Sequence, residues 1–107
     1  MSSGAGVKSY GGWSAYGSSK AAINSIAGHI AVEEPDVTSV AIQPGRVDTE
    51  MQQDIRANAK GIMDTAVYQS FVDVHEQGEL LKPEQPGNVI ANFVAQPAKE
   101  LSGKFLR

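Results

Sequence analysis

The chain has 107 residues, of which 41% are hydrophobic, and its 9 basic and 12 acidic side chains give a net charge of −3. One domain usually has ~100–200 residues, so we expect a single unit over residues 1–107. The mildly acidic charge, without a cluster of Lys and Arg, argues against a nucleic acid or an anionic membrane as partner. Because there is no cysteine and the two histidines lie far apart, disulfides and thiolate chemistry are excluded and no metal site is expected. No apolar run reaches the ~18 residues of a spanning helix, so we expect a cytoplasmic protein.

A long helix is predicted from residue 14 onward. Before it, the first 13 residues are dense in Gly and Ser and indicate a loop. Apolar residues then recur at helical spacing until Glu34-Pro35 supplies a stop, and this face consists of Ile23, Ile26, Ala27 and Ile30. The stretch from Gly17 to Ala22 is built mostly of small residues, which predicts that another backbone or a ligand approaches it closely.

The remainder of the chain predicts two strands and three further helices. Residues 37–43 (VTSVAIQ) are rich in β-branched residues and end at Pro44-Gly45, which is typical of a strand that feeds into a turn. The helices are predicted over residues 50–60 with Thr49 and Gln52 as a capping box, from Asp64 as N-cap up to Gly78, and between Pro86-Gly87 and Pro97. Residues 103–107 predict a terminal strand. This order favours an α/β architecture, and its strands are too few for a self-sufficient parallel sheet.

One pair of side chains stands out as candidate chemistry. Tyr16 and Lys20 are four residues apart and therefore one turn apart on the same helical face. A free phenol is a weak acid near neutrality, and a nearby cation favours its ionised form, so a lysine in this position makes the phenol a better proton donor. A pair at this spacing arises easily by chance, so its meaning depends on the motifs around it.

Two further motifs accompany the pair in a fixed order. Ser2-Ser3 stand upstream, with Ser3 13 positions before Tyr16, and the stretch PGRVDT follows the predicted strand. In these motifs the chain resembles the carboxy-terminal half of the short-chain dehydrogenase/reductase family. The stretches GGWSAYGSSKAAIN and PGRVDTEMQ are most similar to the fungal carbonyl reductases of its benzil-reductase and sepiapterin-reductase-like branch. The resemblance implies a single partial domain: the carboxy-terminal half of a Rossmann-type doubly wound parallel sheet, with few strands and about four helices.

The resemblance also implies a role for each matched residue. Tyr16 would protonate the carbonyl oxygen as hydride arrives, and Ser3 would hydrogen-bond the same oxygen. Lys20 would assist Tyr16 and hold the hydroxyls of the nicotinamide ribose. The implied cofactor contacts are Tyr16, Lys20, Pro44, Gly45, Val47 through its backbone and Thr49 through its hydroxyl. Residues 51–81 would form a lid over the substrate.

The implied enzyme reduces a small carbonyl compound with NADP, or alternatively NAD, and pairs with a second copy through the helix that carries Tyr16 and Lys20. The family binds the pyrophosphate of its cofactor at a Gly-x-x-x-Gly-x-Gly turn. No glycine of this sequence has partners at both i+4 and i+6. We therefore expect a truncated gene product, a fragment or a misassigned start that is inactive by itself.

Each matched residue also has a purely structural interpretation. Ser2 is as good a candidate as Ser3 if the register shifts by one, Thr49 can be an N-cap, and Tyr16 with Lys20 can be a half-exposed helix pair. Two function classes follow: an oxidoreductase active site that is complete only with a nucleotide-binding half, and a non-catalytic remnant that self-associates through its long helix.

Two residues beside these motifs are interpreted more plainly. Trp13 is predicted to line the site or to pack in a loop. Arg46, just inside the Pro-Gly turn, can meet a phosphate, but a solvated side chain is the preferred interpretation.

Overall fold

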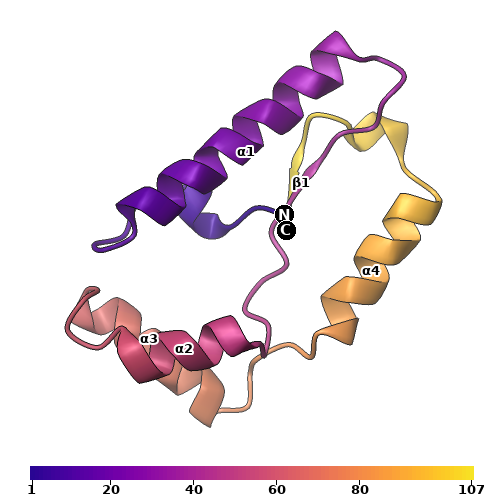
Figure 1. The fold of residues 1–107 in the computed structure, drawn as a ribbon. Helices are drawn as coiled ribbons and strands as arrows, with labels where there is room; N and C mark the ends of the chain where they lie inside the picture. Colours follow the sequence, from indigo (N-terminus) through magenta and orange to yellow (C-terminus); the bar gives the residue numbers. More distant parts are fainter.

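The computed structural model describes all 107 residues, and it contains four α-helices, two short strands and two turns of 3₁₀-helix (Figure 1). In chain order they are η1 (Gly4–Gly6), α1 (Ser14–Glu33), β1 (Ala41–Ile42), α2 (Glu50–Asn58), α3 (Thr65–Glu76), α4 (Glu84–Ala95), η2 (Lys99–Leu101) and β2 (Phe105–Leu106).

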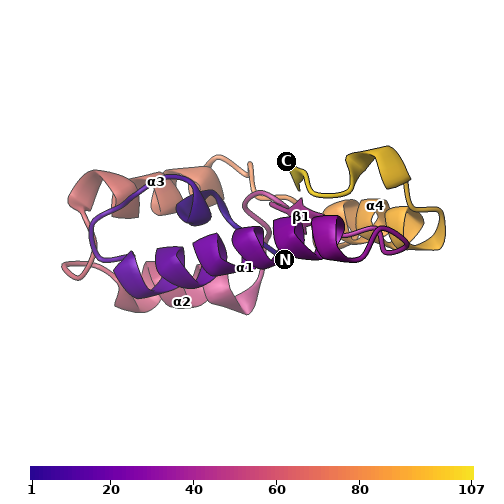
Figure 2. The ribbon, with the colours of Figure 1, turned by 90° about the horizontal axis from the view of Figure 1, so that it is seen from above.

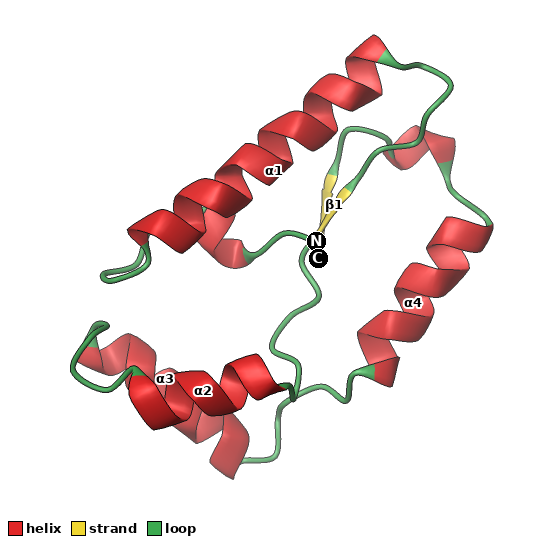
Figure 3. Cartoon of the chain, in the orientation of Figure 1, coloured by secondary structure: helices red, strands yellow, loops and turns green.

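The two strands form a parallel pair in which Ala41 lies opposite Phe105 and Ile42 opposite Leu106. The strand predicted over residues 37–43 is therefore too long, and Figure 3 shows loop on both sides of β1. A strand extends only as far as a neighbour runs beside it, and β2 accompanies β1 for two residues. On its other edge, β1 is met by the first residues of the chain, because the Ser2 N–H donates to the Ile42 carbonyl at 2.7 Å.

The long helix forms as predicted, and its small residues have the predicted use. A Cβ on Gly17 would come within 2.8 Å of the Ala5 carbonyl oxygen, and one on Gly6 within 3.0 Å of the Lys20 carbonyl carbon. The η1 turn thus lies directly on the backbone of α1. This close contact fixes the segment that follows Ser3 against the helix that carries Tyr16.

The N-terminal ends of helices α2 and α4 differ from the predictions. The capping box at Thr49 is not formed, because the Thr49 hydroxyl donates back to the Val47 carbonyl at 3.3 Å and bonds no N–H of α2. Helix α4 begins at Glu84 rather than after Pro86-Gly87, and Pro86 is tolerated there because the first turn leaves its N–H groups unpaired in any case. The Asp64 cap of α3 is confirmed, since its carboxylate accepts from two backbone N–H groups.

The molecule is flat and does not enclose a rounded hydrophobic core. Helices α1 and α4 lie on opposite sides of the strands, and α2 and α3 form a pair beyond them (Figures 1 and 2). The chain measures 46 × 28 × 16 Å with a radius of gyration of 15.5 Å, against ~13 Å for a compact domain of this length. Its accessible surface is 7095 Å², whereas a folded monomer of this mass exposes ~5,700 Å².

Apolar side chains accordingly remain uncovered. Only six residues are buried, and the apolar face predicted for α1 buries only Ala27, while Ile26 stays 54% exposed. On α4, Val89 and Val94 are also exposed. No helix combines the length and the apolar character needed to cross a bilayer. The cytoplasmic location stays a prediction.

Candidate active site

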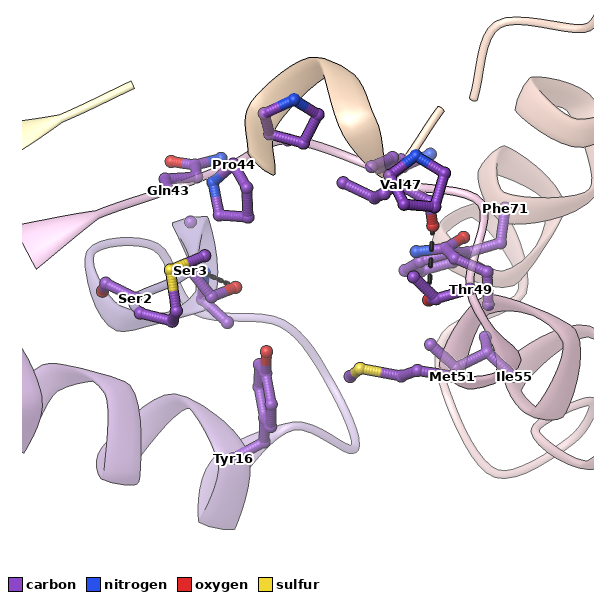
Figure 4. A pocket seen from close by; sticks show the side chains of 18 of the residues that line it. Ser2, Ser3, Tyr16, Gln43, Pro44, Val47, Thr49, Met51, Ile55 and Phe71 are labelled. Carbon is purple, nitrogen blue, oxygen red and sulfur yellow. Dashed lines mark hydrogen bonds between the residues drawn. The ribbon is translucent and has the colours of Figure 1, made fainter. Parts of the chain in front are cut away.

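A cavity of about 490 Å³ opens beyond the end of β1 (Figure 4). In open α/β sheets, ligands bind outside the carboxyl ends of the parallel strands, which is where this cavity lies. It gathers predicted site residues from three parts of the chain: Ser3, Tyr16, Pro44, Gly45, Val47 and Thr49. Lys20 does not line the cavity, and its ammonium lies behind the Tyr16 ring.

The two candidate serines differ in what their hydroxyls do. Ser2 is buried, and its hydroxyl donates to the side-chain carbonyl of Asn24 on α1. The Ser3 oxygen accepts from the Ala5 N–H at 3.2 Å as the N-cap of η1, which leaves the Ser3 proton free to be donated. Ser3 is therefore the better donor to an oxygen in the cavity.

Tyr16 lies in the first turn of α1, and Figure 4 shows its side chain directed from the helix into the cavity, toward Ser3. One turn later, the Lys20 ammonium lies 5.6 Å from the centre of the Tyr16 ring. Lys20 also donates to the Met1 carbonyl at 3.2 Å, so the cation is held between the tyrosine and the segment that leads into Ser3. The structure thus brings the predicted pair together as helical spacing requires.

The turn after β1 presents backbone groups to the cavity. Gly45 has a φ of 87°, a left-handed conformation that favours glycine. Val47 forms a parallel bridge with Leu81, yet its own N–H donates to no carbonyl of the chain. Together with the Thr49 hydroxyl, this open donor gives the cavity wall a pair of polar groups that could hold an amide.

The segment predicted to be the lid, residues 51–81, lines the opposite wall of the cavity. Its base is closed where Asp48 N–H donates to the Leu81 carbonyl at 2.8 Å and Leu81 N–H to the Arg46 carbonyl at 2.9 Å. Inside it, Ile55 and Phe71 are buried and line the cavity. The predicted lid therefore consists of two helices with their connecting segments. Hydrogen bonds join its two ends, and its side toward the cavity is apolar.

Arg46 is not the solvated side chain that the sequence analysis preferred. Its guanidinium donates to the Ser70 carbonyl and to the Ser70 hydroxyl, both at 3.0 Å, and lies 4.4 Å from the centre of the Phe71 ring. Helix α3 supplies these partners, 24 residues away along the chain. No local sequence signal indicates this contact, because it depends on how the lid folds back.

The site thus joins a tyrosine–lysine helix, a serine turn and a Pro-Gly turn at the end of a parallel strand pair, in part of an α/β fold. Residues 1–60, more than half of the chain, match the family model described as short chain dehydrogenase. The chain belongs to the short-chain dehydrogenase/reductase family of oxidoreductases, which uses NAD(P).

Benzil reductases are among its relatives. The chain is 46% identical to the benzil reductase ((S)-benzoin forming) of Saccharomyces cerevisiae, in a match that covers 100% of this chain and 42% of that protein. The benzil reductase ((S)-benzoin forming) of Bacillus cereus is 41% identical, with 88% of this chain and 39% of that protein covered.

Two solved structures have the same fold over the matched region. The crystal structure of the KRED1-Pglu enzyme superposes with a TM-score of 0.94 at 44% identity, covering 98% of this chain and 44% of that one. A short chain dehydrogenase/reductase from Saccharomyces cerevisiae also gives 0.94, at 36% identity, with 99% and 43% covered. The chain therefore spans less than half the length of the proteins it matches, and the predicted partial Rossmann-type α/β fold is confirmed.

Proposed function

We propose that this chain carries the catalytic residues of an NAD(P)H-dependent carbonyl reductase, with Tyr16 as general acid and Ser3 and Lys20 as its partners. The observation that supports the proposal is the convergence of Ser3, Tyr16 and the segment Pro44–Thr49 on one cavity, with the Lys20 ammonium behind the phenol ring.

The chemistry assigns one task to each side chain. Ser3 donates a hydrogen bond to the substrate carbonyl oxygen and stabilises the negative charge that develops there. The Tyr16 O–H transfers its proton to that oxygen as hydride adds to the carbonyl carbon. The Lys20 ammonium stabilises the phenolate that remains, because opposite charges attract strongly in a partly buried site.

The residues at the Pro-Gly turn fit the nicotinamide end of the cofactor. The open Val47 N–H and the Thr49 hydroxyl would hold its carboxamide, Pro44 and Gly45 would shape the wall, and Tyr16 and Lys20 would meet the ribose hydroxyls. When bound, the reduced nicotinamide supplies the hydride. NADP is the proposed cofactor. NAD is kept as the alternative, because the acidic residue that usually selects NAD lies in the other half of a Rossmann fold.

The proposed substrate is a small carbonyl compound. Three of the similar proteins are benzil reductases, so benzil is the first probe to use. We also propose that the complete reductase is a homo-oligomer that pairs through α1, whose Ile23, Ile26 and Val32 are exposed.

The test uses a chimaeric reductase, called the chimaera below. In it, the part of the yeast benzil reductase that precedes the matched region is followed by residues 1–107 of this chain. We expect the chimaera to oxidise NADPH in the presence of benzil. Tyr16→Phe removes only the phenolic hydroxyl and with it the proton donor, so it should lower kcat by about 10²-fold to 10⁴-fold.

The same variant should keep most of its NADPH affinity, because Lys20, Val47 and Thr49 remain to hold the nicotinamide end of the cofactor. A matched control is Tyr68→Phe, because the Tyr68 hydroxyl donates to the Arg56 carbonyl at 2.6 Å outside the cavity wall. Equal turnover of Tyr16→Phe and the unsubstituted chimaera would refute the acid role.

A second candidate function is self-association without catalysis. It is favoured by the exposed apolar side chains of α1 and α4 and by the small number of buried residues. An inactive chimaera that is folded and binds NADPH would support this alternative against the reductase proposal.

A further inference from the structure

A row of four side chains crosses the cavity wall and joins three elements that are far apart in the sequence. The Trp13 ring meets the Tyr16 ring edge to face, with centres 5.3 Å apart and planes at 76°. On its other side, Trp13 stacks on Phe71 of α3, with centres 5.8 Å apart and planes at 9°. Arg46 completes the row over the Phe71 ring at 4.4 Å.

Trp13 is the central member of this row because it touches both the proposed acid and the lid. It is the residue just before α1, three positions ahead of Tyr16, so its side chain lies one turn from the phenol. Its indole N–H is buried and has no hydrogen-bond partner. The indole is therefore positioned by packing, including its two ring contacts, and not by a hydrogen bond.

A second contact brings the lid to the same point. A Cβ on Gly12, which has a φ of 82°, would come within 3.0 Å of the Ile62 carbonyl oxygen and 3.2 Å of the Met63 Cα. The loop between α2 and α3 therefore rests on the backbone immediately before Trp13. The lid meets the catalytic helix through this glycine contact and through the Trp13–Phe71 stack.

We propose that Trp13 is a positioning residue that couples the closed position of the lid to the orientation of the Tyr16 hydroxyl. This inference rests on the proposed function, because it assigns a role to Trp13 in the reaction of that site. When Phe71 supports one face of the indole, its edge limits the swing of the Tyr16 ring. When the lid moves away, the indole loses that support and the phenol is less well aimed at the substrate oxygen.

The placement has a kinetic consequence. Proton transfer requires the hydroxyl to lie within hydrogen-bond reach of the carbonyl oxygen, and small misplacements of a reacting group lower the rate steeply. The loss of Trp13 should therefore act on kcat rather than on KM. An indole that merely filled a wall would, on removal, change KM at least as much as kcat.

The first arm of the test needs no activity. Trp13 is the only tryptophan among the 107 residues, so the fluorescence of the full chain reports this side chain alone. Phe71→Leu should shift the emission to longer wavelength, because it uncovers one face of the indole. Phe93→Leu makes the same change on α4, outside the cavity, and should leave the emission in place. Identical spectra for Phe71→Leu and the unsubstituted chain would overturn the inference.

The second arm measures benzil reduction by the chimaera. Trp13→Leu should lower kcat about tenfold to hundredfold and leave KM within about twofold, whereas Trp13→Phe keeps both ring contacts and should recover most of the loss. Phe71→Leu should lower kcat as well. In the double variant Trp13→Leu/Phe71→Leu, the fold-decrease in kcat should be smaller than the product of the two single decreases, because both substitutions break the same Trp13–Phe71 contact. Independent, multiplicative losses, or an effect on KM alone, would overturn the inference.

The two arms separate this inference from the proposed function. If the unsubstituted chimaera binds NADPH but does not reduce benzil or other ketones, the proposed function fails, and the coupling to catalysis fails with it. If the chimaera is active and Trp13→Leu matches it in kcat, the proposed function stands and only the role of Trp13 is wrong.

Discussion

Lys20 shows how one cation can serve two neighbours. Its ammonium lies 5.6 Å from the centre of the Tyr16 ring and donates to the Met1 carbonyl at 3.2 Å, so it is anchored at the start of the serine segment. Lys8 has almost the same geometry over Tyr10, at 5.5 Å, yet it is exposed and lies outside the cavity wall. The two cation–ring pairs therefore have similar geometry and differ in the exposure of the lysine and in the groups around it.

This difference leads to a paired prediction. In the chimaera, Lys20→Met should lower kcat for benzil reduction by about 10²-fold and weaken NADPH binding, because in the proposed function this lysine both stabilises the phenolate and holds the ribose. Lys8→Met removes the same charge and should leave both values within about twofold. Steady-state kinetics and a fluorescence titration with NADPH measure the two effects, and equal losses in the two variants would contradict the assignment.

Two helix starts give a second residue-level prediction. The Asp64 carboxylate accepts from the Ala66 and Val67 N–H groups at 3.0 and 3.2 Å, whereas the Thr49 hydroxyl bonds no N–H of its helix. Asp64→Ala should therefore lower the free energy of unfolding of the chimaera by about 1 kcal/mol, and Thr49→Ala by clearly less. Urea unfolding followed by circular dichroism checks the difference; a larger loss for Thr49→Ala would show that the capping geometry is wrong.

Helix α1 combines two kinds of glycine in one element. Gly17 lies under η1, so that an added Cβ meets the Ala5 carbonyl at 2.8 Å, whereas Gly28 has no atom within 4 Å of its added Cβ. The first glycine permits a backbone contact, and the second only weakens the helix. The segment that carries Ser3 depends on the first.

Opposite effects should follow from the same substitution. Gly28→Ala should raise the free energy of unfolding by about 0.5–1 kcal/mol through better helix propensity. Gly17→Ala gains the same propensity but forces η1 off the helix, so it should lower stability by about 1 kcal/mol or more and reduce benzil turnover in the chimaera. Thermal unfolding and kinetics of the two variants test this; a stabilising Gly17→Ala would mean that η1 does not rest on α1.

The elements that the sequence predicted well are those with local causes. Helix α1 follows from apolar spacing and the stop at Glu34-Pro35, and α3 follows from the Asp64 cap. The length of β1 depends on β2, which lies more than 60 residues further along, so composition alone overestimated it. Arg46 was misjudged for the same reason, since its partners on α3 are visible only once the lid folds back.

The candidate site divides in the same way. Tyr16, Lys20 and the Pro-Gly turn could be named from motifs, and helical geometry already requires the first two to be neighbours. Ser2 and Ser3 both line the cavity, and which of them can donate to a ligand depends on Asn24, 22 residues away, which accepts the hydrogen bond of the Ser2 hydroxyl. The row from Tyr16 to Arg46 has no motif, because its members come from three segments that meet only in the folded chain.

At the scale of the whole molecule, the accessible surface area is larger than that expected for a folded monomer of this mass. The accessible area of 7095 Å² is ~1,400 Å² above the value expected for its mass. Residues such as Val32, Val89 and Val94 are 69–80% exposed. Exposed apolar side chains in such numbers are usually covered by another part of a protein or by a second copy.

The last prediction concerns the 107-residue chain alone, which should neither bind a dinucleotide tightly nor stay monomeric. In the proposed function, Val47, Thr49 and Lys20 hold only the nicotinamide end of the cofactor, and the sequence has no Gly-x-x-x-Gly-x-Gly turn to hold the pyrophosphate. Calorimetric titration with NADPH and NADH should therefore show no micromolar binding. Size-exclusion chromatography should give a mass well above 11.3 kDa, because the exposed faces of α1 and α4 can bury each other only between copies. A monodisperse monomer that binds NADPH at micromolar concentration would contradict both halves of the argument, since it would need a phosphate site and a covered surface that these residues do not provide.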